Sequence, residues 1–256
     1  MLNRMNEMVL FLLAVGGFIV AMEAGYRMGR LLQAKANDRY RTHAASVQSS
    51  ILGLLALLLG FNFAMAAARF DSRRSLEQDE VNAIATSYVR ASLLSEPRRS
   101  EAITLMRSYV AARLDFARAE PDSPELIEAT TESSRVENSL WRLAGADESV
   151  RSDALVAALT EMTNLKWRRY TSIGNHVPYP VTHLLFVVGL IAIGFVGFGY
   201  GLDGVRMHRL TAVYAVLVAM VLTITFDLDR PRGGLIRVGE DGLQRLQVAM
   251  DKDPIQ

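Results

Sequence analysis

The sequence predicts an all-α membrane protein with four spans and a helical extramembrane domain between the second and third spans. Its apolar residues cluster in four long blocks separated by charged residues, whereas a soluble core would spread them along the chain. The central block runs from Ile51 to Ala68, about 18 residues, which is long enough for a helix to cross the bilayer core. Asn62 is its one polar residue, and charged residues follow the block directly.

The composition excludes several classes of function. The 256 residues carry a formal net charge of +1, a balance that argues against nucleic-acid binding. There is no cysteine, so the chain has no disulfide or thiolate chemistry. It also has no phosphate-binding glycine loop, no His-Glu-x-x-His motif and no nucleophile elbow. We therefore expect no enzymatic activity, no cofactor and no metal site, and we expect the scattered histidines to be interfacial: His43, His176, His183 and His208.

The first apolar block, residues 8–26, is predicted to be the first span. A basic residue before it also fits a signal peptide, but Glu23 stands where a small-residue cleavage site would be needed. Two interpretations of Glu23 remain open. It is either an acid at the membrane edge, paired with Arg27 or Arg30, or an intramembrane acid in an ion or proton path.

The next segments follow from changes in composition. A polar connection, residues 27–48, leads to the second span at 50–69, so residues 1–70 form a transmembrane hairpin. Residues 71–175 contain no apolar run of membrane length, and their apolar positions recur at helical spacing, which predicts the helical extramembrane domain. One of its helices begins at Ser123, because a proline and an acid follow this N-cap residue.

The chain then returns to the membrane in a second hairpin, residues 176–227. Its predicted spans are 181–202 and 210–226. An amphipathic tail, residues 228–256, is expected to pack on the extramembrane domain. The turn that opens this tail contains Asp227, Asp229 and Arg230. Two acids there could hold a hard cation, but the basic neighbours favour a salt-bridged turn that anchors the tail.

Several short motifs lie at the ends of the predicted spans. Gly60-Phe61, followed by Arg69-Phe70 and Arg74, resembles the second transmembrane helix of bestrophins in identity and spacing. The re-entry Pro178-x-Pro180 and the acidic turn before Pro231 are similar as well, and so is the order of spans and domain. The sequence resembles in particular the bacterial bestrophin-like group, at residues 69–74, 80–84 and 229–231.

This resemblance implies a site. Bestrophins are pentameric ion channels whose second helices line a hydrophobic neck. The corresponding neck residues would be Gly53, Leu57 and Phe61, which stack on one side of a helix because they are spaced four apart. Rings of Leu57 and Phe61 could gate by dewetting, with Asn62 and Arg69 at the wider mouth. The alternative is that Leu57 and Phe61 only contact lipid or other helices.

The resemblance also implies partners and a location. The partners are the lipid bilayer, further copies of the chain and inorganic ions, and the location is the bacterial inner membrane with the termini and the helical domain in the cytoplasm. Basic residues on the two sides of the spans nearly cancel, so this orientation follows from the resemblance. A second hypothesis is a non-conducting interaction or stress-response protein that binds partners through its helical domain.

Overall fold

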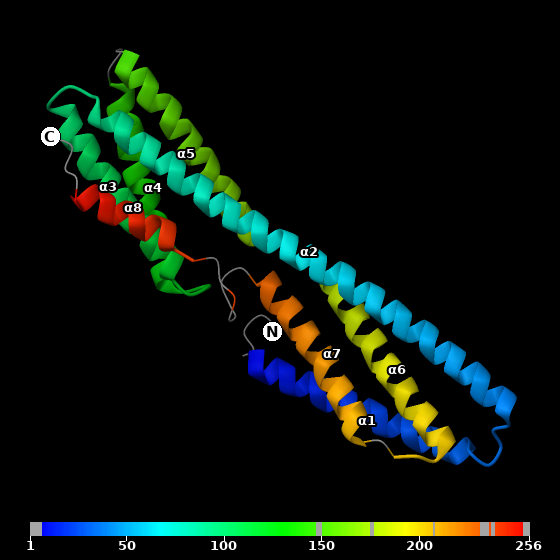
Figure 1. The fold of residues 1–256 in the computed structure, drawn as a ribbon. Helices are drawn as coiled ribbons and strands as arrows, with labels where there is room; N and C mark the ends of the chain where they lie inside the picture. Colours follow the sequence, from blue (N-terminus) through cyan, green and yellow to red (C-terminus); the bar gives the residue numbers. More distant parts are fainter. Residues whose placement is uncertain are drawn as a thin grey trace. The chain divides into compact units, whose positions relative to one another are not determined.

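A computed structural model describes residues 7–146, 150–174, 177–206, 208–230, 236 and 239–252 (Figure 1). This part of the chain forms eight helices and contains no strand, so the predicted all-α class is confirmed. The helices are α1 (Glu7–Leu32), α2 (Asp38–Ser92), α3 (Arg98–Arg118), α4 (Pro124–Gly145), α5 (Val150–Gly174), α6 (Tyr179–Asp203), α7 (His208–Asp229) and α8 (Asp241–Lys252).

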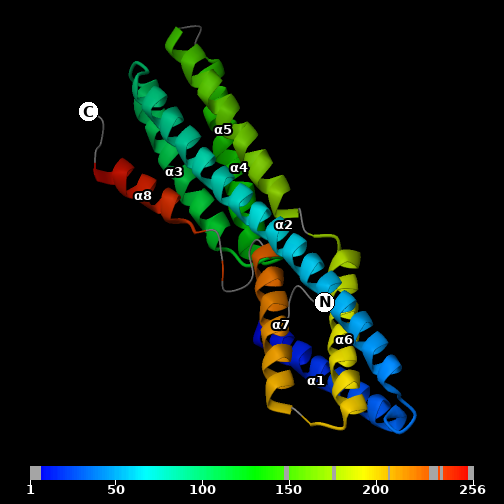
Figure 2. The same cartoon turned by 45° about the vertical axis from the view of Figure 1, so that its right-hand side comes forward.

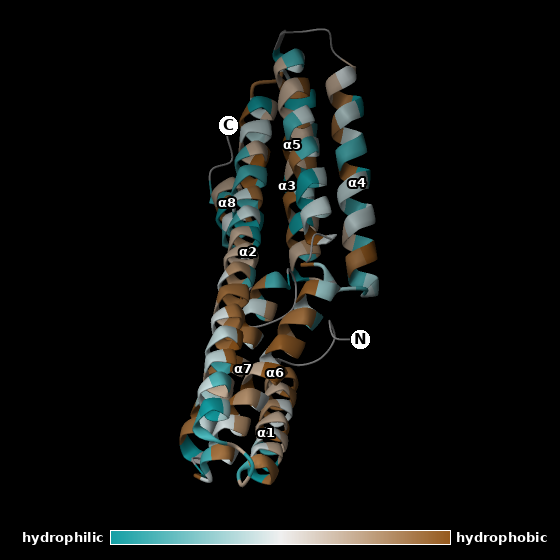
Figure 3. Ribbon diagram, turned by 90° about the vertical axis from the view of Figure 1, so that its right-hand side faces the viewer, coloured by the Kyte–Doolittle hydropathy of each residue, from teal (hydrophilic) through white to brown (hydrophobic). Residues whose placement is uncertain are grey.

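The chain divides into two compact units. The span unit comprises Met1–Phe70 and His176–Arg237, and the helical unit comprises Asp71–Asn175 and Val238–Gln256. Four helices are long and apolar enough to cross a membrane, and all four contribute to the span unit: Met8–Leu32, Asp38–Ser92, Pro180–Asp203 and Arg209–Asp229. Apolar residues dominate α1, α6 and α7 in Figure 3.

The helices extend beyond the predicted spans. The largest correction is α2, a single helix of 55 residues, where the sequence suggested a polar connection over 27–48 and a span over 50–69. The actual turn between α1 and α2 covers only residues 33–37. No proline lies between Asp38 and Ser92, and strong helix formers such as Ala, Leu, Arg and Glu continue through both polar flanks of the apolar core. The polarity of the residues changes along this segment, but their helix propensity stays high, so the helix continues through the change.

Large apolar side chains from several helices fill the interior of the span unit. Phe18 of α1, Leu55 of α2 and Ile193 of α6 are almost completely buried, together with Ala215 of α7. Figures 1 and 2 show α1, α6 and α7 lying together. Many apolar side chains on the outside stay exposed, as expected for a surface that faces lipid.

Helices α1 and α6 approach so closely that their backbones touch. A Cβ atom placed on Gly25 would lie 1.9 Å from the carbonyl oxygen of Gly194, and one on Gly201 would lie 2.2 Å from the carbonyl oxygen of Tyr26. The same holds for Gly29 and Gly197. Small residues at helix contacts are the usual basis of close packing in membranes, where no hydrophobic effect drives helices together.

The helical unit has its own core, formed by α3, α4, α5, α8 and the C-terminal part of α2. Met106, Leu140, Leu159 and Leu243 are completely buried in it. The predicted start of α4 is confirmed, because the Ser123 hydroxyl accepts a hydrogen bond from the backbone nitrogen of Leu126 at 3.2 Å. Leu243 and Met250 of α8 also belong to this core, so the amphipathic tail helix packs within the helical unit.

Candidate pore helix and its anchoring contacts

One face of α2 is apolar and uncovered. Leu57 is 55% exposed and Phe61 is 64% exposed, and a Cβ atom on Gly53 would meet no atom within 4 Å. These three residues lie four apart, so they form a continuous stripe along the helix, called here the α2 stripe. The structure therefore brings the predicted neck residues together on one surface of the span unit.

The opposite face of α2 packs inside the span unit. Leu55, Asn62 and Ala66 are at most 6% exposed. Because each residue turns an α-helix by about 100°, Asn62 lies well over 90° away from the middle of the α2 stripe. The structure thus separates Asn62 from Leu57 and Phe61. Its side-chain oxygen is buried without a hydrogen-bond partner in the described part of the chain.

Arg69 closes the apolar part of α2 and contacts the end of α7. Its Nη1 atom lies 3.4 Å from Oδ1 of Asp229. The backbone nitrogen of Val177, just before α6, donates to the same carboxylate at distances of 2.9 and 3.1 Å. Asp229 therefore joins three segments that are far apart in sequence. The contact is partly buried, since the side chains of Arg69 and Asp229 are 28% and 13% exposed.

Asp227 and Arg230, the residues near Asp229, also make contacts at the start of the tail. The backbone nitrogen of Ile236 donates to Asp227 at 2.9 Å, and the Arg230 guanidinium lies 4.4 Å from the centre of the Phe226 ring, a cation–π distance. Asp227, Asp229 and Arg230 are all at most 9% exposed. Pro231, which contributes to the resemblance to bestrophins, lies outside the described residues.

Glu23 has a local partner. The Nε atom of Arg27, one helical turn further along α1, lies 2.8 Å from Oε1 of Glu23, and the Glu23 side chain is 31% exposed. The charge of Glu23 is therefore paired, as the first of the two interpretations drawn from the sequence expects. The position of Glu23 relative to the membrane stays a prediction.

The helical unit contains a buried charge network that the sequence did not reveal. Oε1 of Glu80 lies 2.7 Å from Nε of Arg113, and its Oε2 lies 2.6 Å from Nη1 of Arg169. Glu80 lies beyond the charged end of the apolar block, where α2 belongs to the helical unit. Burial opposes its ionisation, but the two guanidiniums hold the pKa of Glu80 below its ordinary value. The partners lie 33 and 89 residues away, so no local spacing could have identified them.

A second acid, Glu77, is buried without such compensation. It is 5% exposed, and its Oε1 atom has no hydrogen-bond partner in the part of the chain that the structure describes. It faces the start of α8, where a Cβ atom on Gly242 would lie 2.8 Å from Oε1. Burial raises the pKa of Glu77; Glu80 and Asp241 add to the rise, and Arg169 and Arg245 oppose it.

The described residues offer no metal centre. They contain no group of three or more His, Asp or Glu side chains that could hold a metal ion. Of the four histidines, His43 and His183 are exposed. His176 and the side chain of His208 lie outside the described part.

These features define a class: a helical membrane protein with four candidate spans, an uncovered apolar stripe on its longest helix and a separate helical unit. The family model of the Bestrophin-like domain matches residues 15–243, and the chain therefore belongs to the Bestrophin-like family. This confirms the resemblance found in the sequence motifs.

Solved structures share the fold. A bacterial bestrophin homologue from Klebsiella pneumoniae is similar with a TM-score of 0.67 and 16% identity, over 97% of this chain and 97% of that one. Two variants of a Klebsiella pneumoniae homologue have TM-scores of 0.66 and 0.63 at 15% identity, covering 98% and 97% of this chain and 99% of their own. The comparison with curated proteins gave no match.

Proposed function

We propose that the chain assembles with copies of itself, as a pentamer, into a passive ion channel whose α2 helices surround the axis. The neck consists of Gly53, Leu57 and Phe61. The observation that carries this proposal is the α2 stripe, because two large apolar side chains of a spanning helix remain more than half exposed. Family membership supports the same reading.

Small residues beside the stripe support assembly through α2. Ala56, Gly60 and Ala64 are spaced four apart and exposed, and a Cβ atom on Gly60 would meet nothing within 4 Å. Such residues let helices from different copies approach closely. Leu57 and Phe61 would then face the axis, where rings of apolar side chains can open and close a pore to water.

The proposed pore mouth lies at the charged end of the apolar block. Arg69 places a positive charge there, and its contact with Asp229 fixes the side chain. A role for Asn62 at the mouth remains a prediction, and it requires the side chain to leave its buried position. The channel would reside in the bacterial inner membrane with both termini and the helical unit in the cytoplasm, and would conduct inorganic ions.

Ion flux from liposomes tests this function. Leu57→Ala with Phe61→Ala should widen the neck and raise flux severalfold, because the apolar constriction loses most of its side-chain volume. Val213 and Leu217 provide a matched control on α7, since they are also four apart and are 59% and 54% exposed. Alanine at these two positions should leave flux unchanged. Equal flux from wild type and the neck variant, with assembly intact, would contradict the proposal.

A specific observation favours the second candidate, a non-conducting protein that binds partners. Because Asn62 points away, the α2 stripe carries no polar side chain that could assist an ion. The helical unit also exposes an aromatic pair, Trp167 and Tyr170, whose rings lie 6.1 Å apart. Electrical recording of the purified protein in bilayers separates the candidates. Silence across different salts and pH values would favour partner binding.

A further inference from the structure

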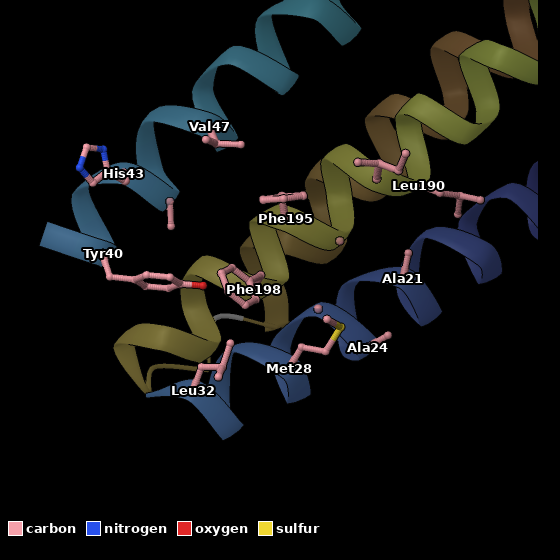
Figure 4. A pocket seen from close by; sticks show the side chains of 14 residues that line it. Ala21, Ala24, Met28, Leu32, Tyr40, His43, Val47, Leu190, Phe195 and Phe198 are labelled. Carbon is pink, nitrogen blue, oxygen red and sulfur yellow. The ribbon is translucent and has the colours of Figure 1, made fainter. Parts of the chain in front are cut away.

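The span unit contains a groove between α1, α2 and α6, with a volume of about 680 Å³. Figure 4 shows α6 between the other two helices, and the ring of Tyr40 reaching from α2 toward Phe198 of α6. Each helix contributes one face at helical spacing. On α2 these are positions 40, 43, 44 and 47; on α1 they include 21, 24, 28 and 32.

The walls of this groove are apolar, and its polar groups gather at one end. Tyr40 and His43 are the only lining residues with polar side-chain atoms. They lie near the turn of residues 33–37, so one end of the groove is polar and the other leads toward Ala21 and Leu190. Along α1 the lining runs from Ala21 to Leu32, about 16 Å at the rise of an α-helix. One leaflet of a bilayer core is about 15 Å deep.

Basic residues lie close in sequence to the lining residues of the polar end. Arg41 is paired with Asp203 at 2.9 Å, but Lys35 and Arg39 are exposed and have no ion pair within the described residues. Arg39 directly precedes Tyr40. The groove thus combines an apolar lining as long as one leaflet with a positively charged rim at its polar end.

We propose that this groove binds an anionic phospholipid, with an acyl chain against Met28, Leu190 and Phe195 and the phosphate near Tyr40, His43 and Arg39. The apolar lining suits an acyl chain, and the positive charge of the rim complements the negative charge of the headgroup. A second copy of the protein is the alternative occupant, and the oligomer number of the groove variants below distinguishes it from a lipid.

Lipid binding to the purified full-length protein tests this site. The probes are palmitoyl-oleoyl phosphatidylglycerol and the phosphatidylcholine with the same chains, each counted per protein chain by native mass spectrometry. The wild type should retain phosphatidylglycerol preferentially. Ala44→Trp fills the groove and should reduce phosphatidylglycerol retention about tenfold, because the acyl chain loses its apolar contacts. Ala45→Trp is the matched control, since Ala45 is exposed and does not line the groove.

Further variants test the acyl-chain contacts and the headgroup charge separately. Met28→Trp narrows the groove from α1, at a side chain that is 60% exposed and tolerant of change, and should act like Ala44→Trp. Arg39→Gln with His43→Gln should lower the preference for phosphatidylglycerol over phosphatidylcholine about threefold or more while leaving phosphatidylcholine bound. Free palmitate should fail to displace the phospholipid.

Two results would overturn the proposal. One is equal phosphatidylglycerol retention by the wild type, Ala44→Trp and Met28→Trp. The other is a change in oligomer number with unchanged lipid content in these variants, which would show that another copy of the chain fills the groove.

Discussion

Gly25 of α1 and Gly194 of α6 are in backbone contact: a Cβ atom on Gly25 would lie 1.9 Å from the carbonyl oxygen of Gly194. No side chain lies between the two helices at this point. The separation of α1 and α6 is therefore set by glycine itself, and any added carbon must push the helices apart.

Gly25→Ala should consequently destabilise the span unit. Overpacking of a tight contact costs about 1–3 kcal/mol, which outweighs the gain in helix propensity. The thermal melting temperature in detergent measures the effect. Gly16→Ala on the same helix is the control, because its Cβ atom would meet nothing within 4 Å. An equal melting temperature for the two variants would contradict this description of the contact.

The buried ion pairs of Glu80 lead to a prediction for the helical unit. Glu80→Gln leaves the guanidiniums of Arg113 and Arg169 buried without their counter-charge, so we expect a loss of about 3–5 kcal/mol in unfolding free energy. Denaturant unfolding measures it. Glu132→Gln removes an exposed partner of Arg135 and should change nothing measurable. If the two substitutions had similar effects, the Glu80 network would not stabilise the fold.

Glu77 should make stability depend on pH in the opposite sense to an ordinary ion pair. Its pKa is raised in the folded protein above the ordinary 4.5, so its protonated form favours folding. That contribution is complete below the ordinary value and is lost as pH rises through the raised pKa. Glu77→Gln should therefore melt higher than wild type at pH 8, with the difference vanishing near pH 4.

The exposed neighbour Asp79 provides the control for this experiment, because Asp79→Asn changes the same charge on the same helix without burial. It should show no such pH-dependent difference. A Glu77→Gln variant less stable than wild type at pH 8 would mean that the ionised carboxylate is needed.

Asp229 should be essential to the junction of α2, α6 and α7. Asp229→Ala removes the acceptor for the backbone nitrogen of Val177 and the partner of Arg69. Leaving the buried backbone nitrogen of Val177 unsatisfied costs about 1–3 kcal/mol. We expect lower thermal stability and faster proteolysis near residue 177. Asp203→Ala, which breaks the more exposed pair with Arg41, should have a clearly smaller effect.

The sequence predicted the fold class because hydropathy alone marks membrane-length helices, and it predicted the start of α4 because a cap is a local signal. It did not predict that α2 continues from Asp38 to Ser92, since a change in polarity resembles a boundary. The sequence also could not show which glycines of α1 contact which glycines of α6. These pairs depend on how each helix is rotated about its axis, and the sequence alone does not fix that rotation.

The candidate site could likewise be predicted only in part. The spacing of Gly53, Leu57 and Phe61 places them on one face of any helix, and the structure leaves that face uncovered. Asn62 follows Phe61 in sequence, yet it is buried because one residue turns the helix by about 100°. The charges around Glu80 depend on contacts between distant helices and had no signal in the local sequence.

The proposed channel requires Phe61 to face a shared conducting axis, and the absence of cysteine from the sequence allows a direct measurement. Phe61→Cys and, as control, Leu217→Cys are reconstituted in planar bilayers, and the current is recorded before and after adding a charged thiol-reactive reagent. The current should change strongly for Phe61→Cys and should not change for Leu217→Cys. A current that the reagent leaves unchanged at position 61, although the thiol is shown to be modified, would contradict it.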